Sequence, residues 1–353
     1  MFESILYDQI KAERTNSCQS FLKEYGIEED ELKKVIGLDN ELKEVLLTSS
    51  LVHGLANRTS DVDLILVTSS NKITSKAATQ VFNNGKHFET ISFLSEDLEE
   101  VFLRLNEISG FTDHELLKAF SNWDATEKIP KKYTERIVNG VNLKWELPFF
   151  EHIPNLARIW KIHSFNNFRQ CVACAILAIR AEELNSAKGY IVNGLLYIMD
   201  SIMSHFGFVF SNKKWFLQRW EHHKKYHIDM PLYREVSSLW IRAVKALSSN
   251  NNPNNVEHLY SLYRNCIEVL NVAIENRDLN PIAIKKDYLN KNPFIRESNL
   301  LINDSGNTSV VALRNLTENE IEMIPFSEFY NLSKEDAKVI LCLLRSRVAK
   351  IFL

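Results

Sequence analysis

An Asp-x-Asp pair at the start of an apolar run constrains this chain more than any other feature. The pair consists of Asp61 and Asp63, and the residues after it read Leu-Ile-Leu-Val. Side chains alternate along a strand, so carboxylates two residues apart point to the same face. A short apolar run of this kind is typical of a buried strand. We therefore expect two carboxylates side by side where a buried strand begins.

A turn of small residues precedes the pair by about ten positions. It contains Ser49, Ser50 and Gly54. Such a turn offers backbone N–H groups and close approach to a phosphate, and carboxylate oxygens are the ligands that Mg²⁺ prefers. Acids that bind metal beside a turn that binds phosphate are the groups that phosphoryl or nucleotidyl transfer requires.

Composition limits the class of protein. The chain has 353 residues, of which 45% are hydrophobic and 25% charged, as in ordinary globular proteins of two or three domains. The net charge of −3 weighs against coating nucleic acid by bulk electrostatics. Five cysteines favour free thiols in a reducing compartment. The first residues do not resemble a signal peptide, and the apolar runs are shorter than a membrane span. We expect a cytoplasmic protein with no membrane contact.

Periodicity predicts the secondary structure. The first half reads as helices at 1–48 (including 28–46), 72–84, 97–105 and 114–120, with strands at 61–67 and 87–94. Pro130 marks a joint. The pattern then becomes helical from Pro154 to Asn276, with helices at 168–184, 189–206, 233–247 and 256–276. The tail predicts a hairpin between 300–302 and 309–313 and a helix from Ser333 to Phe352.

These patterns predict an α/β (α+β) core with a mixed sheet, an all-helical bundle domain and a small C-terminal α+β module. The expected domains are N-terminal helices at 1–40, a catalytic domain at 41–130, a helical domain at 150–285 and an α+β or winged-helix-like module at 290–353.

The motif resembles a known family. Ser49-Ser50-x-x-x-Gly54, followed by Ser60-Asp61-x-Asp63, is similar to the Gly-Ser…Ser-Asp-x-Asp signature of the polymerase-beta-like nucleotidyltransferase superfamily. It looks most like the small-molecule branch, which includes the aminoglycoside nucleotidyltransferases. The resemblance covers about residues 49–91. The family's first glycine is Ser49 here, and serine adopts a positive φ less readily, so the turn is expected to differ in geometry. We interpret the serine as a tolerated variant.

The resemblance implies roles for individual residues. Asp61 and Asp63 would hold two Mg²⁺ ions, and Glu89 on the next strand would be the third ligand. Ser49, Ser50, Gly54 and Ser60 would lie at the nucleotide, with Ser50 at the triphosphate. A weaker match over 207–217 places Lys214 where it would neutralise triphosphate charge.

The implied activity is an Mg²⁺-dependent nucleotidyltransferase. It would move an NMP from an NTP, expected to be ATP, to a hydroxyl, carboxylate or amine of a small-molecule acceptor, releasing pyrophosphate. Two alternatives stay open: a catalytically altered nucleotide-binding regulatory protein, and a transferase acting on nucleic acid or protein. The absence of a long basic stripe weighs against nucleic acid. The acceptor, the general base, the oligomeric state and the role of the tail are not determined by the sequence.

Three further groups have two interpretations each. Glu182 and Glu183 are general-base candidates or a solvated helix face. His53 contacts substrate or packs. The segment 221–227, which contains His222, His223 and His227, binds metal or is a polar helix end, and we favour the latter.

Overall fold

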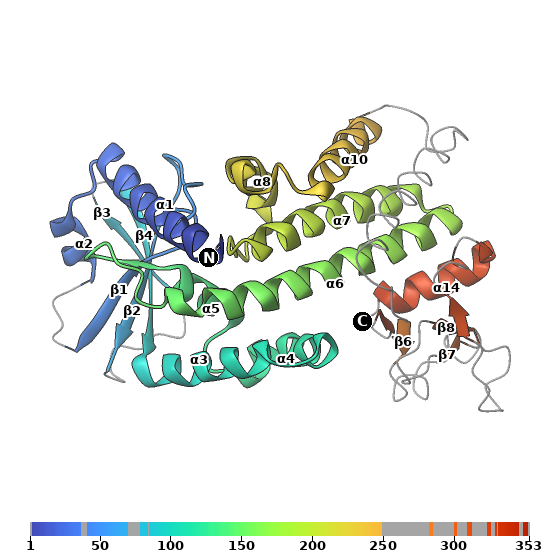
Figure 1. Cartoon of the computed structure of the whole chain (residues 1–353), viewed down its shortest axis with the longest axis horizontal. Coiled ribbons are helices and arrows are strands. Elements are labelled where there is room, and N and C mark those ends of the chain that lie inside the picture. The colour runs from blue at the N-terminus through green and yellow to red at the C-terminus, as the bar shows by residue number, and fades with distance from the viewer. Residues whose placement is uncertain are drawn as a thin grey trace. The chain divides into compact units, whose positions relative to one another are not determined.

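The computed structural model of the chain is shown in Figure 1. It describes residues 2–36, 41–69, 78–83 and 85–248, and then 282–284, 300–301, 309–312, 323–325, 329, 331–345 and 349–351. The chain forms two compact units. Unit 1 comprises Met1–Ile162 and Asp200–Lys224, and unit 2 comprises His163–Met199 and Lys225–Leu353. These units do not coincide with the expected domain boundaries, which stay a prediction.

Unit 1 is built on a five-stranded mixed sheet with the order β3-β4-β2-β1-β5. Its strands are β1 (Leu42–Leu47), β2 (Val62–Thr68), β3 (Thr79–Asn83), β4 (Lys86–Leu94) and β5 (Val141–Asn142). The β2 and β4 strands are parallel, and the other neighbours are antiparallel. The predicted α+β class with a mixed sheet is confirmed.

Two N-terminal helices cover one face of this sheet, α1 (Phe2–Glu24) and α2 (Glu29–Ile36). Val62, Leu64 and Phe88 point to this face and share a core with Leu22 of α1 and Leu32 of α2. Complete burial of a side chain such as Phe88 stabilises the fold by about 1.5–3 kcal/mol. This core holds the beginnings of β2 and β4 side by side.

Six further helices among the described residues lie wholly within unit 1. They are α3 (Ser95–Ser109), α4 (Asp113–Thr126), α5 (Lys131–Asn139), η1 (Phe150–His152), η2 (Lys213–Trp215) and α8 (Phe216–His222). A capping box between Thr112 and Glu115 begins α4. The α5 helix lies over the second face of the sheet, since its Tyr133 ring packs on Phe93 of β4 with 5.4 Å between centroids.

Several predicted elements are confirmed and several are wrong. The strands at 61–67 and 87–94 and the helices at 97–105 and 114–120 are confirmed. The helical prediction for 28–46 is wrong at its end, because β1 begins at Leu42. As a central strand, β1 buries Leu46 and Leu47 completely, so its apolar run lacks the alternation of a half-exposed strand.

The helix predicted over 72–84 is also wrong where the structure describes it, because 79–83 form the edge strand β3. Its period is two: Val81 packs against the core while Phe82 is exposed. The region after Pro130 is a helix, α5, and it lies within unit 1. The predicted helix at 256–276 lies outside the described residues.

Long helices dominate the described part of unit 2. The α6 (Ile153–Arg180) and α7 (Leu184–His205) helices run through both units, and α9 (Lys224–His227) and α10 (Pro231–Ser248) follow. They confirm the helices predicted at 168–184, 189–206 and 233–247. No helix among the described residues combines the length and the apolar character needed to cross a bilayer.

The described residues in the C-terminal part of unit 2 form short strands and the helix α14. They are β6 (Ile282–Ile284), β7 (Leu300–Leu301), β8 (Ser309–Ala312), β9 (Met323–Pro325), α14 (Lys334–Arg345) and β10 (Ala349–Ile351). The antiparallel β7–β8 pair confirms the predicted hairpin. The last helix ends at Arg345, so its predicted extension to Phe352 is wrong.

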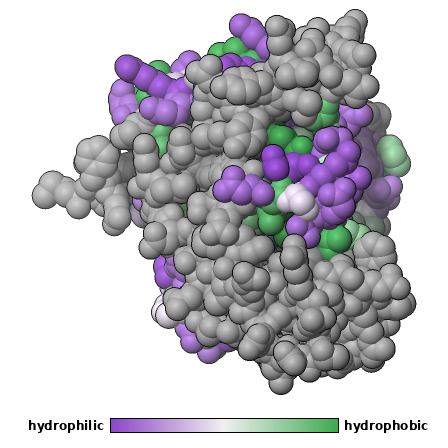
Figure 2. Space-filling model, turned by 90° about the vertical axis from the view of Figure 1, so that its right-hand side faces the viewer, coloured by the Kyte–Doolittle hydropathy of each residue, from purple (hydrophilic) through white to green (hydrophobic). Residues whose placement is uncertain are grey.

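Figure 2 shows hydrophilic and hydrophobic residues side by side on one face, with no uniformly apolar surface among those it colours.

Candidate functional site

Two parallel strands place the three predicted carboxylates on one face of the sheet. In the β2–β4 register, Asp63 stands opposite Glu89. One residue before this pairing begins, Asp61 contacts His87, with 2.6 Å between Oδ1 and Nδ1. Because alternate residues share a face, all four side chains lie on the face turned away from the core formed with α1 and α2.

The edge strand β3 adds one side chain beside Glu89 and one beside His87 on the same face of the sheet. Its Gln80 pairs with Glu89, and its Phe82 pairs with His87. The rings of Phe82 and His87 stack, with 4.6 Å between centroids and 20° between planes. We call the surface made by Asp61, Asp63, Glu89, His87, Gln80 and Phe82 the acid face.

The α5 helix brings cationic side chains to the acid face. Nη1 of Arg136 lies 3.1 Å from Oδ1 of Asp63, and the two side chains are 9% and 14% exposed. Lys132 lies one turn earlier. Burial, and then the charge of Arg136, lowers the pKa of Lys132, while the charges of Glu89 and Asp63 oppose this shift. Burial raises the pKa of Tyr133 beside it.

The sequence reasoning did not identify these α5 residues. Their signal was available, since Lys132, Tyr133 and Arg136 are spaced three and four apart and share one helix face. In the sequence, Pro130 directly before this segment favours a joint, and that signal competes with the helical one.

The donor set of the acid face suits Mg²⁺, which binds carboxylate oxygens. However, no group of three or more potential ligands is arranged to hold a metal ion in the part of the chain that the structure describes. Asp61 faces His87, and Asp63 faces Arg136. The chemistry of the donors therefore fits, and ion binding requires Asp61 and Asp63 to turn away from their protein partners.

The turn after β1 begins beside these acids. The N–H of Thr48 donates to the carbonyl of Asp63 at 3.0 Å. Ser49 has a φ of 64°, in the left-handed region, so the serine does not prevent a positive φ in this turn. Here serine adopts a conformation that glycine accepts freely, at a cost of about 1–2 kcal/mol. The backbone N–H groups of Ser49 and Ser50 have no hydrogen-bonding partner among the described residues.

Replacing Ser49 with glycine tests this strain. The Ser49→Gly variant is expected to gain up to about 1 kcal/mol in the free energy of unfolding, because relief of the left-handed conformation exceeds the entropy of the added glycine. Urea denaturation of the variant and the wild type measures the difference. A loss of stability would show that the Ser49 side chain, which is only 6% exposed, contributes packing that outweighs the strain.

Gly54 and Ser60 have structural roles around the turn. Gly54 has a φ of 65°, and a Cβ at this position would lie 3.0 Å from Ser17 Oγ and 3.1 Å from His222 Nε2. Ser60 Oγ accepts a hydrogen bond from the Asn57 N–H at 3.0 Å, closing the loop just before Asp61. Both residues thus fix the path from β1 to β2.

Ser50 and Lys214 lie in different surroundings. Ser50 is 6% exposed, and its carbonyl accepts hydrogen bonds from the N–H groups of Leu55 and Ala56. Lys214 is exposed, and its ammonium group lies 5.0 Å from the centroid of the Trp215 ring. None of the contacts found for Lys214 among the described residues involves the acid face.

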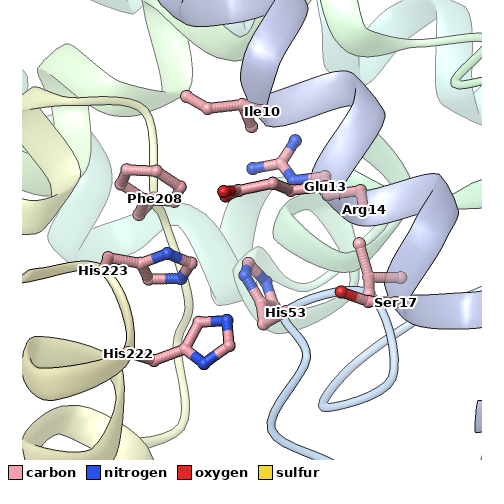
Figure 3. A pocket seen from close by; sticks show the side chains of 9 residues that line it. Ile10, Glu13, Arg14, Ser17, His53, Phe208, His222 and His223 are labelled. Atoms are coloured by element: carbon pink, nitrogen blue, oxygen red, sulfur yellow. The ribbon is translucent and has the colours of Figure 1, made fainter. Parts of the chain in front are cut away.

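A small buried pocket lies behind the turn (Figure 3). Its lining residues are Ile10, Glu13, Arg14, Ser17, Val52, His53, Phe208, His222 and His223. Burial lowers the pKa of Arg14 to about 9, and its Nη2 donates to the Gly207 carbonyl at 3.1 Å. His53 stacks on Phe210 with 4.5 Å between centroids. His53 is 3% exposed, so it packs beneath the turn in this structure.

Two of the three histidines in 221–227 are buried, so the interpretation as a polar helix end holds only for the exposed residues Glu221, His222 and Lys225. His223 is 4% exposed and stacks on Phe208, and His227 is 1% exposed. The Phe208 ring covers His223, and His227 lies against the Tyr233 ring, with 5.6 Å between centroids. Burial, as the largest cause, lowers the pKa of His53 and His223 well below the ordinary value of 6.5.

These two shifts predict acid sensitivity. A histidine with a depressed folded-state pKa binds protons mainly in the unfolded chain, so its stabilising effect is present above pH 6.5 and is lost as the pH falls below it. Each of His53 and His223 is expected to lower the free energy of unfolding by up to about 1.4 kcal/mol per pH unit there. Urea titrations at pH 7.5, 6 and 5 measure this slope. A double replacement by phenylalanine should flatten it, and an unchanged slope would contradict the assignment.

The remaining candidates lie in unit 2. Glu182 and Glu183 form ion pairs with Lys334 and Arg345 of α14. The hydrogen bond from each partner is the main cause that lowers the pKa of each glutamate. Cys174, also in unit 2, is buried, and burial raises the pKa of its thiol to about 12.

Comparisons with known proteins give a family and a distant structural likeness. No curated protein matches the sequence. Among solved structures, the chain is similar to a nucleotidyltransferase-like protein from Exiguobacterium sibiricum 255-15, with 9% sequence identity, a TM-score of 0.34 and 74% of each chain covered. A likeness this low supports no conclusion about the site or its chemistry. The profile of a family of unknown function, DUF6001, matches residues 7–352. The chain therefore belongs to the DUF6001 family.

Proposed function

We propose that this protein is a nucleotidyltransferase that moves an NMP from an NTP, with ATP as the expected donor, to a small-molecule acceptor. One observation carries the proposal. Two parallel strands hold Asp61, Asp63 and Glu89 on one face, beside a turn in which Ser49 adopts a left-handed conformation. The N–H groups of that turn and the carboxylates are the two halves of a site for a metal–triphosphate complex.

Asp61, Asp63 and Glu89 are the residues that would hold Mg²⁺. The ion, when bound, would polarise the phosphoryl oxygens and neutralise their charge. The fit rests on the oxygen donors alone, since two of the acids face His87 and Arg136 in this structure.

The chain's own groups would position the nucleotide. The N–H groups of Ser49 and Ser50 would donate to phosphate oxygens. Arg136 and Lys132 of α5 would stabilise the negative charge of the pyrophosphate as it departs. In the reaction, an acceptor oxygen forms a bond to the α-phosphorus, and the bond to the bridging oxygen of the β-phosphate breaks. The electron pair leaves with pyrophosphate, and the hydroxyl proton passes to solvent.

The test is pyrophosphate release. Purified protein is incubated with ATP, GTP, CTP or UTP and MgCl₂, and with a panel of aminoglycosides, simple sugars, nucleosides, aromatic alcohols, transfer RNA and a test protein. Release that requires both Mg²⁺ and one acceptor, together with the mass of an NMP adduct, supports the proposal. Release only with transfer RNA or protein identifies the alternative acceptor classes.

A second candidate is a nucleotide-binding regulatory protein without transfer activity. The observation that favours it is that Asp61 and Asp63 have protein partners, His87 and Arg136. Calorimetry distinguishes the two candidates. ATP binding that is unaffected by EDTA, without pyrophosphate release from any acceptor, would favour the regulatory protein and contradict transfer.

A further inference from the structure

Phe82 is an exposed aromatic residue at the edge of the sheet. It is 75% exposed, although its neighbour Val81 packs against the core. Natural sheets rarely leave a large apolar side chain on an edge strand without a purpose, because such an edge promotes association. One face of the Phe82 ring is stacked on His87. The ring is thus held in place and still accessible.

Phe82 and the turn after β1 lie on opposite sides of the three acids. In the strand order β3-β4-β2-β1, the turn follows β1, and the acids are on β4 and at the start of β2. Phe82 is on β3, so it lies on the opposite side of the acids from the turn. Its row is Phe82, His87, Asp61, and the adjacent row is Gln80, Glu89, Asp63.

The in-line geometry of phosphoryl transfer would place the acceptor on the side of the acids where Phe82 lies. The attacking and leaving oxygens approach and leave the phosphorus roughly in line. If the turn binds the departing pyrophosphate, the acceptor must arrive from the β3 side. An acceptor placed there would lie over Gln80 and Phe82.

We propose that Phe82, stacked on His87, is the platform on which a planar aromatic ring of the acceptor lies, with the exposed amide of Gln80 available to hydrogen-bond its polar substituents. This inference rests on the proposed function and narrows its substrate class. The acceptor is a small molecule with an aromatic ring and a nucleophilic hydroxyl a few atoms away.

The first test measures binding without catalysis. The probe is 2-phenylethanol, with 1-propanol as the ringless comparison, and binding is followed by saturation-transfer NMR on the full chain. Wild type and Phe82→Trp are expected to bind the aromatic alcohol. Phe82→Ala should bind it about five- to tenfold more weakly, the scale of one aromatic pair. The matched control is Leu103→Ala, which removes another exposed apolar side chain, 70% exposed on α3. Circular dichroism verifies folding of each variant.

Equal binding of 2-phenylethanol by wild type and Phe82→Ala, or no binding by either, would overturn the platform. A second measurement separates it from the proposed function. With an acceptor identified by pyrophosphate release, Phe82→Ala should raise the acceptor KM and leave the ATP KM unchanged. Pyrophosphate release that is insensitive to Phe82→Ala refutes the platform alone. Ring binding that depends on Phe82, without release from any acceptor, refutes nucleotidyl transfer and leaves the ring-binding site.

Discussion

The Asp61→Asn variant is expected to reduce pyrophosphate release by about three orders of magnitude or more, while the protein stays folded. The amide removes a charged oxygen ligand, and loss of one ligand in a site of this kind costs several kcal/mol of transition-state stabilisation. The Asp61 side chain is 46% exposed, so the change costs the folded state little. Steady-state pyrophosphate assays and thermal denaturation of the same samples measure both effects.

Asp63→Asn should abolish turnover equally, and it also weakens the pair with Arg136. We expect it to lose about 1 kcal/mol of stability in addition. The matched control is Glu99→Gln, an exposed carboxylate-to-amide change on α3 that lies outside the acid face. Full pyrophosphate release by either aspartate variant would remove the basis of the proposed function.

Asp200→Ala is expected to destabilise the protein by about 3–5 kcal/mol, the largest stability change that we predict. Asp200 forms an ion pair with Arg219, and the two side chains are 2% and 0% exposed. Removing the carboxylate leaves a buried guanidinium without its counter-charge, which costs far more than the pair contributes. Arg219 Nη1 also donates to the Phe210 carbonyl at 2.8 Å, and Phe210 stacks on His53 beneath the turn.

The double variant Asp200→Leu/Arg219→Met provides the control. Because it removes both charges and keeps side-chain volume, its loss of stability should be much smaller than the sum of the single changes. Urea denaturation measures all three variants. A loss below about 1 kcal/mol for Asp200→Ala would show that Arg219 finds another partner or reaches water.

The strand pair that carries the acids was predictable from sequence, because β2 is an apolar run that begins at Asp-x-Asp and β4 alternates polar and apolar residues. The register that places Asp63 opposite Glu89 was not, since it depends on long-range pairing. The β1 strand was missed because its residues also suit a helix, and tertiary context overrides such propensities. The roles of Arg136 and Phe82 were not predictable from sequence. Arg136 contacts Asp63, and Phe82 contacts His87, only once the sheet and α5 have assembled.

The ion pair between Arg136 and Asp63 has a consequence for the order of ligand binding under the proposed function. Free Mg²⁺ would have to compete with a cation that the protein already supplies. A nucleotide that arrives with its metal ion brings phosphates that offer Arg136 a new partner, so each ligand would lower the cost of binding the other. Such thermodynamic coupling is reciprocal. Magnesium and nucleotide should therefore bind with positive cooperativity. Before they bind, Arg136 supplies the positive charge that Asp63 would otherwise need from a divalent ion.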